Sequence, residues 1–194
     1  MPELIPLFSK PIYISSIDID PLDLSEIDWA KNFNNSISKN QNILSHDKFS
    51  AVLSCLSTNI NDYFYGVLGV AQQTEIFITE SWLNKTEKGQ SHHRHWHPNS
   101  IISGIIYLQG DEKSGHTKFI TGQYDLLEFE ITQPNLYNSK SWSIEPITNR
   151  VIIFPSNLEH LVEEYTGEIP RITLSFNTFV NGTINSLPLT RLSF

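Results

Sequence analysis

The sequence predicts a mainly β protein whose helices are confined to its N-terminal part. Apolar side chains recur near helical spacing over residues 48–69. From Thr74 onward the chain changes to short segments rich in branched and aromatic residues, separated by turn-forming residues. Many short strands after a helical lead-in are typical of a sandwich or barrel with helices packed outside it.

The N-terminal part is expected to support the β region rather than to belong to it. A short extended piece over residues 4–14 is followed by a turn-rich stretch over residues 18–24. Acidic and hydroxyl side chains at the start of residues 25–38 predict a first helix there, and a second helix fits residues 48–69.

The β region opens with a predicted strand over residues 74–83. The next, over residues 101–108, is almost entirely apolar, which is typical of a strand buried on both faces. Further strands are predicted over residues 117–121, 126–131, 142–145, 151–154, 161–164 and 171–179.

The segment from Arg171 to Asn177 alternates apolar residues at even positions with polar residues at odd positions. One interpretation is a half-exposed strand whose polar face meets water. The other is a strand whose polar face lines a ligand cavity inside a barrel. The position of the segment shortly after His160 favours the second interpretation.

Composition and charge limit the classes of function. The 194 residues fit one domain, and a formal net charge of −8 argues against a nucleic-acid partner, because a phosphate footprint needs clustered Lys and Arg. The single cysteine, Cys55, excludes an internal disulfide framework and is expected to be a small buried hydrophobe. No signal-peptide pattern and no membrane span are recognisable, so a soluble cytoplasmic protein is expected.

A cluster of histidines precedes the apolar strand at residues 101–108. His95 and His97 are two residues apart, so on a strand both project to the same side while Trp96 points away. They can therefore share one metal ion. His92 and His93 are expected to belong to a solvated loop.

A third ligand is predicted far downstream at His160. It follows an apolar strand that ends in a Pro-Ser turn, a place where a lone histidine is more often structural. Arg171 changes this interpretation, because a guanidinium needs an anionic partner or several acceptors if it is buried. A dicarboxylate would supply one through bidentate hydrogen bonds, and Thr173 on the same strand face could donate to it.

Four motifs carry a resemblance to a known family. They are His-x-His-Pro-Asn-Ser at 95–100, Ser-Gly-Ile-Ile-Tyr-Leu at 103–108, Phe-Pro-Ser at 154–156 ahead of His160, and Arg-Ile-Thr-Leu-Ser-Phe-Asn at 171–177. With them the chain resembles a small phage and bacterial branch of the iron(II)/2-oxoglutarate-dependent oxygenases, over roughly residues 74–177.

The resemblance implies a double-stranded β-helix, the cupin-like jelly roll. In one domain, residues 1–72 would then be mainly helical support, residues 73–180 the jelly-roll core and residues 181–194 a C-terminal tail. The implied site residues are His95, His97 and His160 for iron(II), Arg171 and Thr173 for the distal carboxylate of 2-oxoglutarate, and Tyr107 as a secondary candidate for the same pocket.

The implied reaction uses 2-oxoglutarate, dioxygen and a primary substrate that the sequence does not name. Its co-products would be succinate and CO2, and its outcome hydroxylation of a C–H bond, with a prolyl or other peptidyl residue as a plausible target. Neither a nucleic acid nor a membrane is an expected partner, and the oligomeric state is left open.

The chain departs from the widespread pattern of two histidines and one carboxylate, because His97 stands where Asp or Glu is usual. Three ligand sets stay open: three histidines, which we favour; a carboxylate from elsewhere, such as Asp111; or two protein ligands with an exogenous anion.

Two other functions compete with the oxygenase. A cupin-like metal protein that does not use 2-oxoglutarate would commonly have a Glu shortly after His-x-His, and residues 98–104 contain none. It would also leave Arg171 without a role. A non-enzymatic module with a vestigial site is the third hypothesis, and three histidines also suit zinc.

Overall fold

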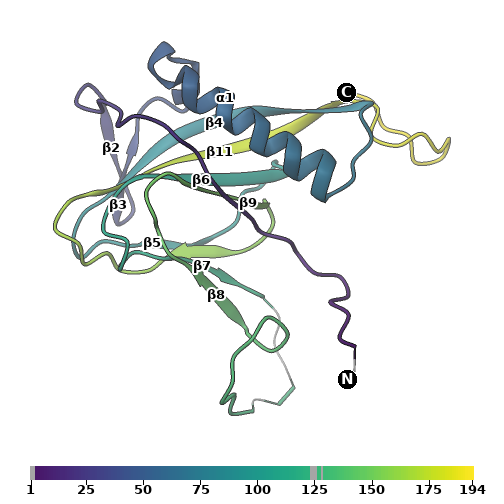
Figure 1. The fold of residues 1–194 in the computed structure, drawn as a ribbon. Helices are drawn as coiled ribbons and strands as arrows, with labels where there is room; N and C mark the ends of the chain where they lie inside the picture. Colours follow the sequence, from purple (N-terminus) through teal and green to yellow (C-terminus); the bar gives the residue numbers. More distant parts are fainter. Residues whose placement is uncertain (1–2, 123–125, 128) are drawn as a thin grey trace.

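The computed structural model describes residues 3–122, 126–127 and 129–194 and has two facing antiparallel sheets with a helix outside the larger one (Figure 1). Within these residues, the major sheet has the strand order β1 (Tyr13–Ser16), β9 (Arg150–Pro155), β6 (Ile102–Gln109), β11 (Arg171–Gly182), β4 (Thr74–Thr86), β3 (Asn35–Ser38) and β2 (Trp29–Asn32). The minor sheet has the order β5 (His92–His95), β10 (His160–Val162), β7 (Thr117–Ile120) and β8 (Ser141–Ile144). The architecture is the predicted double-stranded β-helix.

The second predicted helix is confirmed. Helix α1 (Ser50–Asn61) continues into a π-helical turn, η3 (Asp62–Val67), and two short 3-10 turns precede it, η1 (Ile43–Ser45) and η2 (Asp47–Phe49). The side chains of Val52, Leu56 and Ile60 are buried at intervals of four residues, which puts them on one helix face against the major sheet (Figure 1).

The first predicted helix, over residues 25–38, is wrong. Strands β2 and β3 form a hairpin there, in which Asn32 faces Asn35 across a two-residue turn. Phe33 adopts a positive φ of 40°, and the side-chain Nδ2 of Asn32 donates to Asn35 Oδ1 at 3.1 Å. Short polar side chains that bond locally favour turns over helix, and pairing of β3 with β4 adds the hairpin to the major sheet.

Most predicted strands are confirmed with small shifts in their ends, and β4 continues three residues beyond the predicted end. Of the extended piece at residues 4–14, only the last part enters a strand, where β1 pairs with β9. The predicted strand over residues 126–131 includes residue 128, which lies outside the described residues, and the described part of that segment forms no strand.

The two faces of β11 meet different surroundings. Leu174 and Phe176 pack in the core beneath α1, whereas the polar side chains of Arg171, Thr173 and Asn177 face the minor sheet. These three are only 1%, 2% and 9% exposed. The interpretation as a half-exposed strand is therefore wrong, and the polar face is enclosed between the sheets.

A second apolar cluster closes the space between the sheets. Tyr107, Phe119 and Phe154 belong to it, and Phe119 and Phe154 meet edge to face with ring centroids 4.9 Å apart. Across the described residues, no helix is both long and apolar enough to cross a membrane.

Candidate metal centre and anion pocket

Three imidazoles converge between the two sheets. His95 ends β5, His97 follows it, and His160 begins β10 directly opposite His95 in the strand register. One ring nitrogen from each lies within 4.8 Å of the others, and His97 and His160 are only 8% and 2% exposed. We call these three residues the inner histidine cluster.

Hydrogen bonds fix the orientation of all three rings. Nδ1 of His95 and Nδ1 of His160 each lie near the backbone carbonyl two residues earlier, at 2.8 and 3.0 Å. Nδ1 of His97 lies 2.5 Å from Oδ1 of Asn177. Because these oxygens only accept, Nδ1–H donates in each case and Nε2 keeps a free lone pair. Nε2 of His97 is buried and has no hydrogen-bond partner among the described residues.

Burial keeps these imidazoles neutral. It lowers the pKa of His95 to about 4. It also lowers the pKa of His97 and moves that of His160 well below its ordinary value. Near pH 7 the rings are therefore in the unprotonated form that binds a metal ion. Three such imidazoles, with no described carboxylate among them, suit a divalent ion with positions left open for other ligands.

Asn177 supports the cluster from β11. Its Oδ1 also accepts a hydrogen bond from Ser103 Oγ at 2.8 Å, while its Nδ2 donates to Glu80 Oε2 at 3.3 Å. These partners set which end of the amide faces His97. The alternating sequence predicts that Asn177 lies on a polar strand face, but its contact with His97 joins residues 80 positions apart and leaves no local signal.

Asp111, the carboxylate considered as an alternative ligand, lies elsewhere. Its carboxylate accepts the backbone N–H of Lys113 at 2.8 Å, and its own N–H donates to the hydroxyl of Tyr165 at 2.8 Å. Asp111 does not belong to any group of potential metal-ligating side chains among the described residues. Asp111 thus stabilises a turn in this structure.

Arg171 lies at the other end of the buried polar face of β11 from Asn177. Its guanidinium carbon lies 5.2 Å from the ring centroid of Tyr107, and Nη2 donates to Thr117 Oγ1 at 3.4 Å. Nε is buried without a partner, and among the described residues no carboxylate forms a salt bridge with Arg171. Burial lowers its pKa. A fully buried guanidinium without an anionic partner is costly, so this site is suited to an anion.

Strand β4 brings further polar atoms to this end. In register, Thr86 lies opposite Arg171 and Asn84 lies opposite Thr173. The amide nitrogen of Asn84 donates to Ser175 Oγ at 3.1 Å, but its Oδ1 and the hydroxyl of Thr86 are buried without partners. The sequence analysis missed both residues. Both lie in the part of β4 beyond the predicted end of that strand, where three consecutive polar residues give no alternating pattern.

Tyr107, the secondary candidate, lies beside Arg171 and is fully buried. Its hydroxyl donates to Thr117 Oγ1 at 2.7 Å, and burial raises its pKa, so it stays neutral. Thr117, which the sequence analysis did not identify, therefore joins the hydroxyl of Tyr107 and the guanidinium of Arg171.

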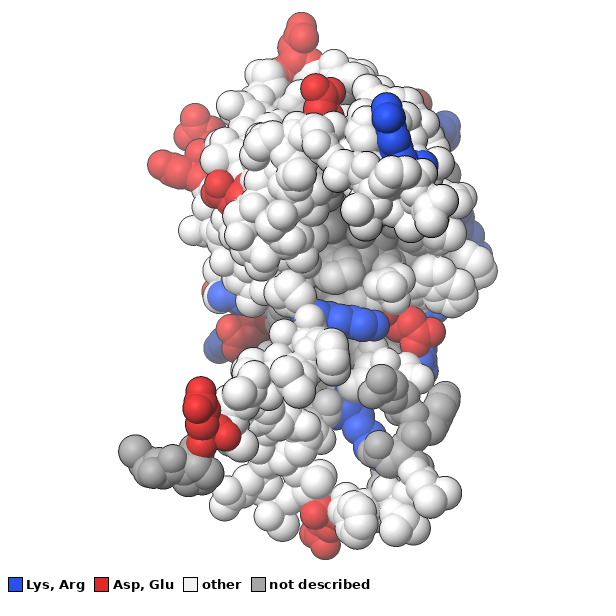
Figure 2. Space-filling model, turned by 90° about the vertical axis from the view of Figure 1, so that its right-hand side faces the viewer, with Lys and Arg blue, Asp and Glu red and all other residues white. Residues whose placement is uncertain are grey.

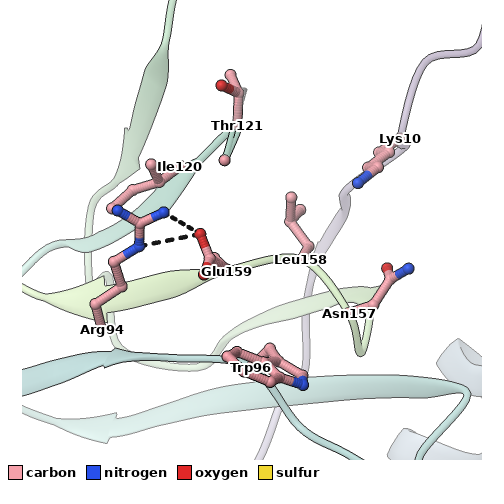
Figure 3. Close-up of a pocket in the computed structure, with 9 residues that line it drawn as sticks. Lys10, Arg94, Trp96, Ile120, Thr121, Asn157, Leu158 and Glu159 are labelled. Carbon is pink, nitrogen blue, oxygen red and sulfur yellow. Dashed lines mark hydrogen bonds and ion pairs between the residues drawn. The ribbon is translucent and has the colours of Figure 1, made fainter. Parts of the chain in front are cut away.

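A surface pocket of about 410 Å³ adjoins the segments that carry the inner histidine cluster (Figure 3). Trp96 lies between His95 and His97 in the sequence but lines this pocket and is 55% exposed, as its alternation with them predicts. Arg94 forms an ion pair with Glu159, and Lys10 lies across from them (Figure 3). On the hollowed face shown in Figure 2, the described Lys and Arg side chains are scattered among Asp and Glu and form no broad basic patch.

Comparison with known proteins identifies the family. Residues 80–177, about half of the chain, match the family described as "Putative 2OG-Fe(II) oxygenase". This match includes the inner histidine cluster and Arg171, and it favours an oxygenase over a cupin-like protein of another activity. Among curated proteins, none matches the chain significantly.

Solved structures share the fold at low sequence identity. A 2OG-Fe(II) oxygenase family oxidoreductase from Burkholderia pseudomallei is 14% identical with a TM-score of 0.56, covering 79% of this chain and 72% of that one. HygX from Streptomyces hygroscopicus, with nickel, 2-oxoglutarate and hygromycin B bound, is 12% identical with a TM-score of 0.53, covering 80% and 74%. A prolyl hydroxylase from Trichoplax adhaerens, in complex with a hypoxia inducible factor peptide, is 16% identical with a TM-score of 0.50, covering 75% and 62%.

Proposed function

The chain belongs to the 2OG-Fe(II) oxygenase family, and from this premise we propose that it couples oxidative decarboxylation of 2-oxoglutarate to hydroxylation of a second substrate. One molecule each of 2-oxoglutarate, dioxygen and substrate would give succinate, CO2 and the hydroxylated product. The observation that carries the proposal is the pairing of two incomplete sites between the sheets: three imidazoles with no described carboxylate among them, and a buried arginine with no anionic partner among the described residues.

The inner histidine cluster is the proposed iron(II) site. The free Nε2 lone pairs of His95, His97 and His160 fit a divalent ion, and the bonds at Nδ1 hold each ring in the required tautomer. Bound iron(II) would supply the site at which 2-oxoglutarate and dioxygen meet. The three-histidine set is thus preferred over a carboxylate-containing set, because no described carboxylate belongs to the group of potential ligand atoms formed by these histidines.

Arg171 is the proposed anchor for the distal carboxylate of 2-oxoglutarate. Its unpartnered Nε–H can donate to that carboxylate, and Thr173 on the same strand face can add a hydroxyl donor. Thr86, beside Arg171 in the register, can add another. Tyr107 and Thr117 hold the guanidinium from the opposite side. Together these residues orient the dicarboxylate and exclude water from it.

For the primary substrate, we propose that a peptidyl residue, with proline among the candidates, is the class to test first. The exposed indole of Trp96 offers an apolar face with a polar edge, which suits packing against a pyrrolidine ring. Peptides carrying proline should then gain one oxygen atom, detectable by mass spectrometry. If only small molecules were hydroxylated, the proposed substrate class would be wrong, but the proposed reaction would stand.

The reaction itself can be tested without knowing the substrate. Protein purified without a histidine tag and supplied with iron(II), ascorbate, 2-oxoglutarate and air should release succinate above a metal-free control. The R171A variant should fall to that control, whereas R150A, which removes a half-buried arginine of β9, should not. Absence of succinate despite demonstrated binding of iron and 2-oxoglutarate would contradict uncoupled turnover and favour either a strictly substrate-gated oxygenase or a non-oxygenase metal protein.

A further inference from the structure

We propose that His92, His93 and His95 form a second, outer site for a divalent transition-metal ion. The outer site shares His95 with the inner histidine cluster and serves as the position at which an ion enters from solution. This inference depends on the arrangement of the imidazoles and not on the use of 2-oxoglutarate.

The geometry of the outer site is that of a metal site. One ring nitrogen from each of the three residues lies within 4.8 Å of the others. The ring centroids are 4.9 Å apart for His92 and His93, 4.6 Å for His92 and His95, and 5.2 Å for His93 and His95. Imidazole nitrogen at such spacing suits zinc, nickel, copper and iron.

An irregularity in the strand pairing brings these rings together. His95 lies opposite His160 and His92 opposite Val162, so three residues of β5 advance where β10 advances two. Such a bulge turns residues that are three apart toward the same side. The rings of His92 and His95 accordingly stack, with an interplanar angle of 17°.

The two sites exclude each other because they share His95. Nδ1 of His95 donates to the carbonyl of His93 at 2.8 Å, so only Nε2 is available to a metal ion. One lone pair binds one ion. A single ion therefore occupies either the outer or the inner position.

The two positions differ in how accessible they are to solvent. His93 is exposed and His92 and His95 are partly buried, whereas His97 and His160 are buried. An ion from solution meets the outer site first. It can move inward by exchanging His92 and His93 for His97 and His160 while it stays bound to His95, so it never returns to free solution during the transfer.

The outer site can be measured alone in the double variant H97A/H160A. Untagged metal-free protein would be titrated with Ni²⁺ by calorimetry, after circular dichroism has shown that the variant is folded. We expect one equivalent of Ni²⁺, bound more weakly than by the wild-type protein. Adding H93A should weaken this binding by at least about tenfold, as expected for loss of a ligand. Adding H46A, which removes an exposed histidine elsewhere, should leave it unchanged.

Entry through the outer site has a kinetic test in the otherwise wild-type protein. H93A should slow Ni²⁺ loading, followed by stopped flow, by about tenfold while the equilibrium affinity stays the same, because His93 is absent from the inner cluster. A folded double variant that binds no Ni²⁺ overturns the outer site. If the double variant does not fold, the loading rate decides, and an H93A rate equal to that of the wild-type protein overturns the proposal. Neither measurement contains 2-oxoglutarate, so failure of the proposed oxygenase reaction would not alter the result.

Discussion

On β11, Leu174 and Phe176 face the core beneath α1, while Arg171, Thr173 and Asn177 face the minor sheet. Both faces are buried, and the side chains of the apolar face pack within the main hydrophobic core. On the polar side, Nε of Arg171 and several neighbouring atoms have no partner among the described residues. Burial alone therefore does not distinguish a structural face from a binding face. Unsatisfied polar groups do, because leaving them buried costs free energy that a ligand can recover.

The difference between the faces leads to separable effects of mutation. Changes on the apolar face should lower the free energy of unfolding and leave the affinity of folded molecules unchanged. Changes on the polar face should lower ligand affinity and have a smaller effect on folding.

The largest effect on binding is expected for R171A. Truncating one partner of a buried charge pair costs about 2–5 kcal/mol, so 2-oxoglutarate affinity should fall by tens-fold or more. Calorimetric titration of Ni²⁺-loaded protein would measure it, with R150A as the matched control on β9. Metal affinity should change little. Equal loss of metal and 2-oxoglutarate affinity would indicate a structural role for Arg171 instead.

A change of similar size is expected on the apolar face, but in the free energy of unfolding and not in ligand affinity. Leu174 is fully buried, and L174A should lower the free energy of unfolding by about 2–5 kcal/mol through lost contacts and a cavity. Urea denaturation would measure this, and L187A, at a 63% exposed position, is the control. A drop in 2-oxoglutarate affinity of the folded fraction would contradict the separation of the two faces.

The next effect concerns the support of the metal centre. N177A removes the acceptor of His97 Nδ1–H and should weaken metal binding by about 10–100-fold. Competition against a chelator of known affinity would measure this. N181A changes an exposed asparagine on the same strand and should have no effect. Unchanged affinity in N177A would mean that the ring of His97 is held by other contacts.

A smaller effect is expected for T173V, which removes one hydroxyl and nearly preserves side-chain shape. Loss of a single hydrogen bond of about 0.5–1.5 kcal/mol should weaken 2-oxoglutarate by about two- to tenfold. The free energy of unfolding should hardly change, and T79V on exposed β4 surface is the control. An unaltered 2-oxoglutarate affinity would remove Thr173 from the anion pocket.

The smallest effect should come from mild acidification of the metal-free protein. Burial lowers the pKa of His92 to about 3 and that of His95 to about 4, so below pH 6.5 the unfolded chain binds more protons than the folded one. The contribution of these two histidines to the free energy of unfolding is therefore fully present above pH 6.5 and declines as the pH falls toward their lowered pKa values. Thermal unfolding at pH 7.5, 6.5 and 5.5 should show a falling Tm, with a smaller fall in H92Q. A Tm that rises on acidification would contradict the assignment.

Several elements could be predicted because their signals are local. The two-residue spacing of His95 and His97, the alternation after Arg171 and the apolar run near residues 101–108 each follow from the geometry of a strand. Residues 25–38 could not be assigned in this way, because pairing with β4 stabilises a hairpin where the local pattern suggested a helix.

The candidate site also has a part that follows from local sequence signals and a part that does not. The spacing of three histidines, an arginine and a threonine in the sequence is enough to predict a metal site and an anion site. The groups that surround these residues depend on the tertiary structure. It brought Asn177 to His97, placed Thr86 and Asn84 beside the anion pocket, kept Asp111 away from the histidines, and turned His92 toward His95. Contacts between residues so distant in sequence depend on sheet order and register, which arise from the packing of the whole chain and leave no local pattern.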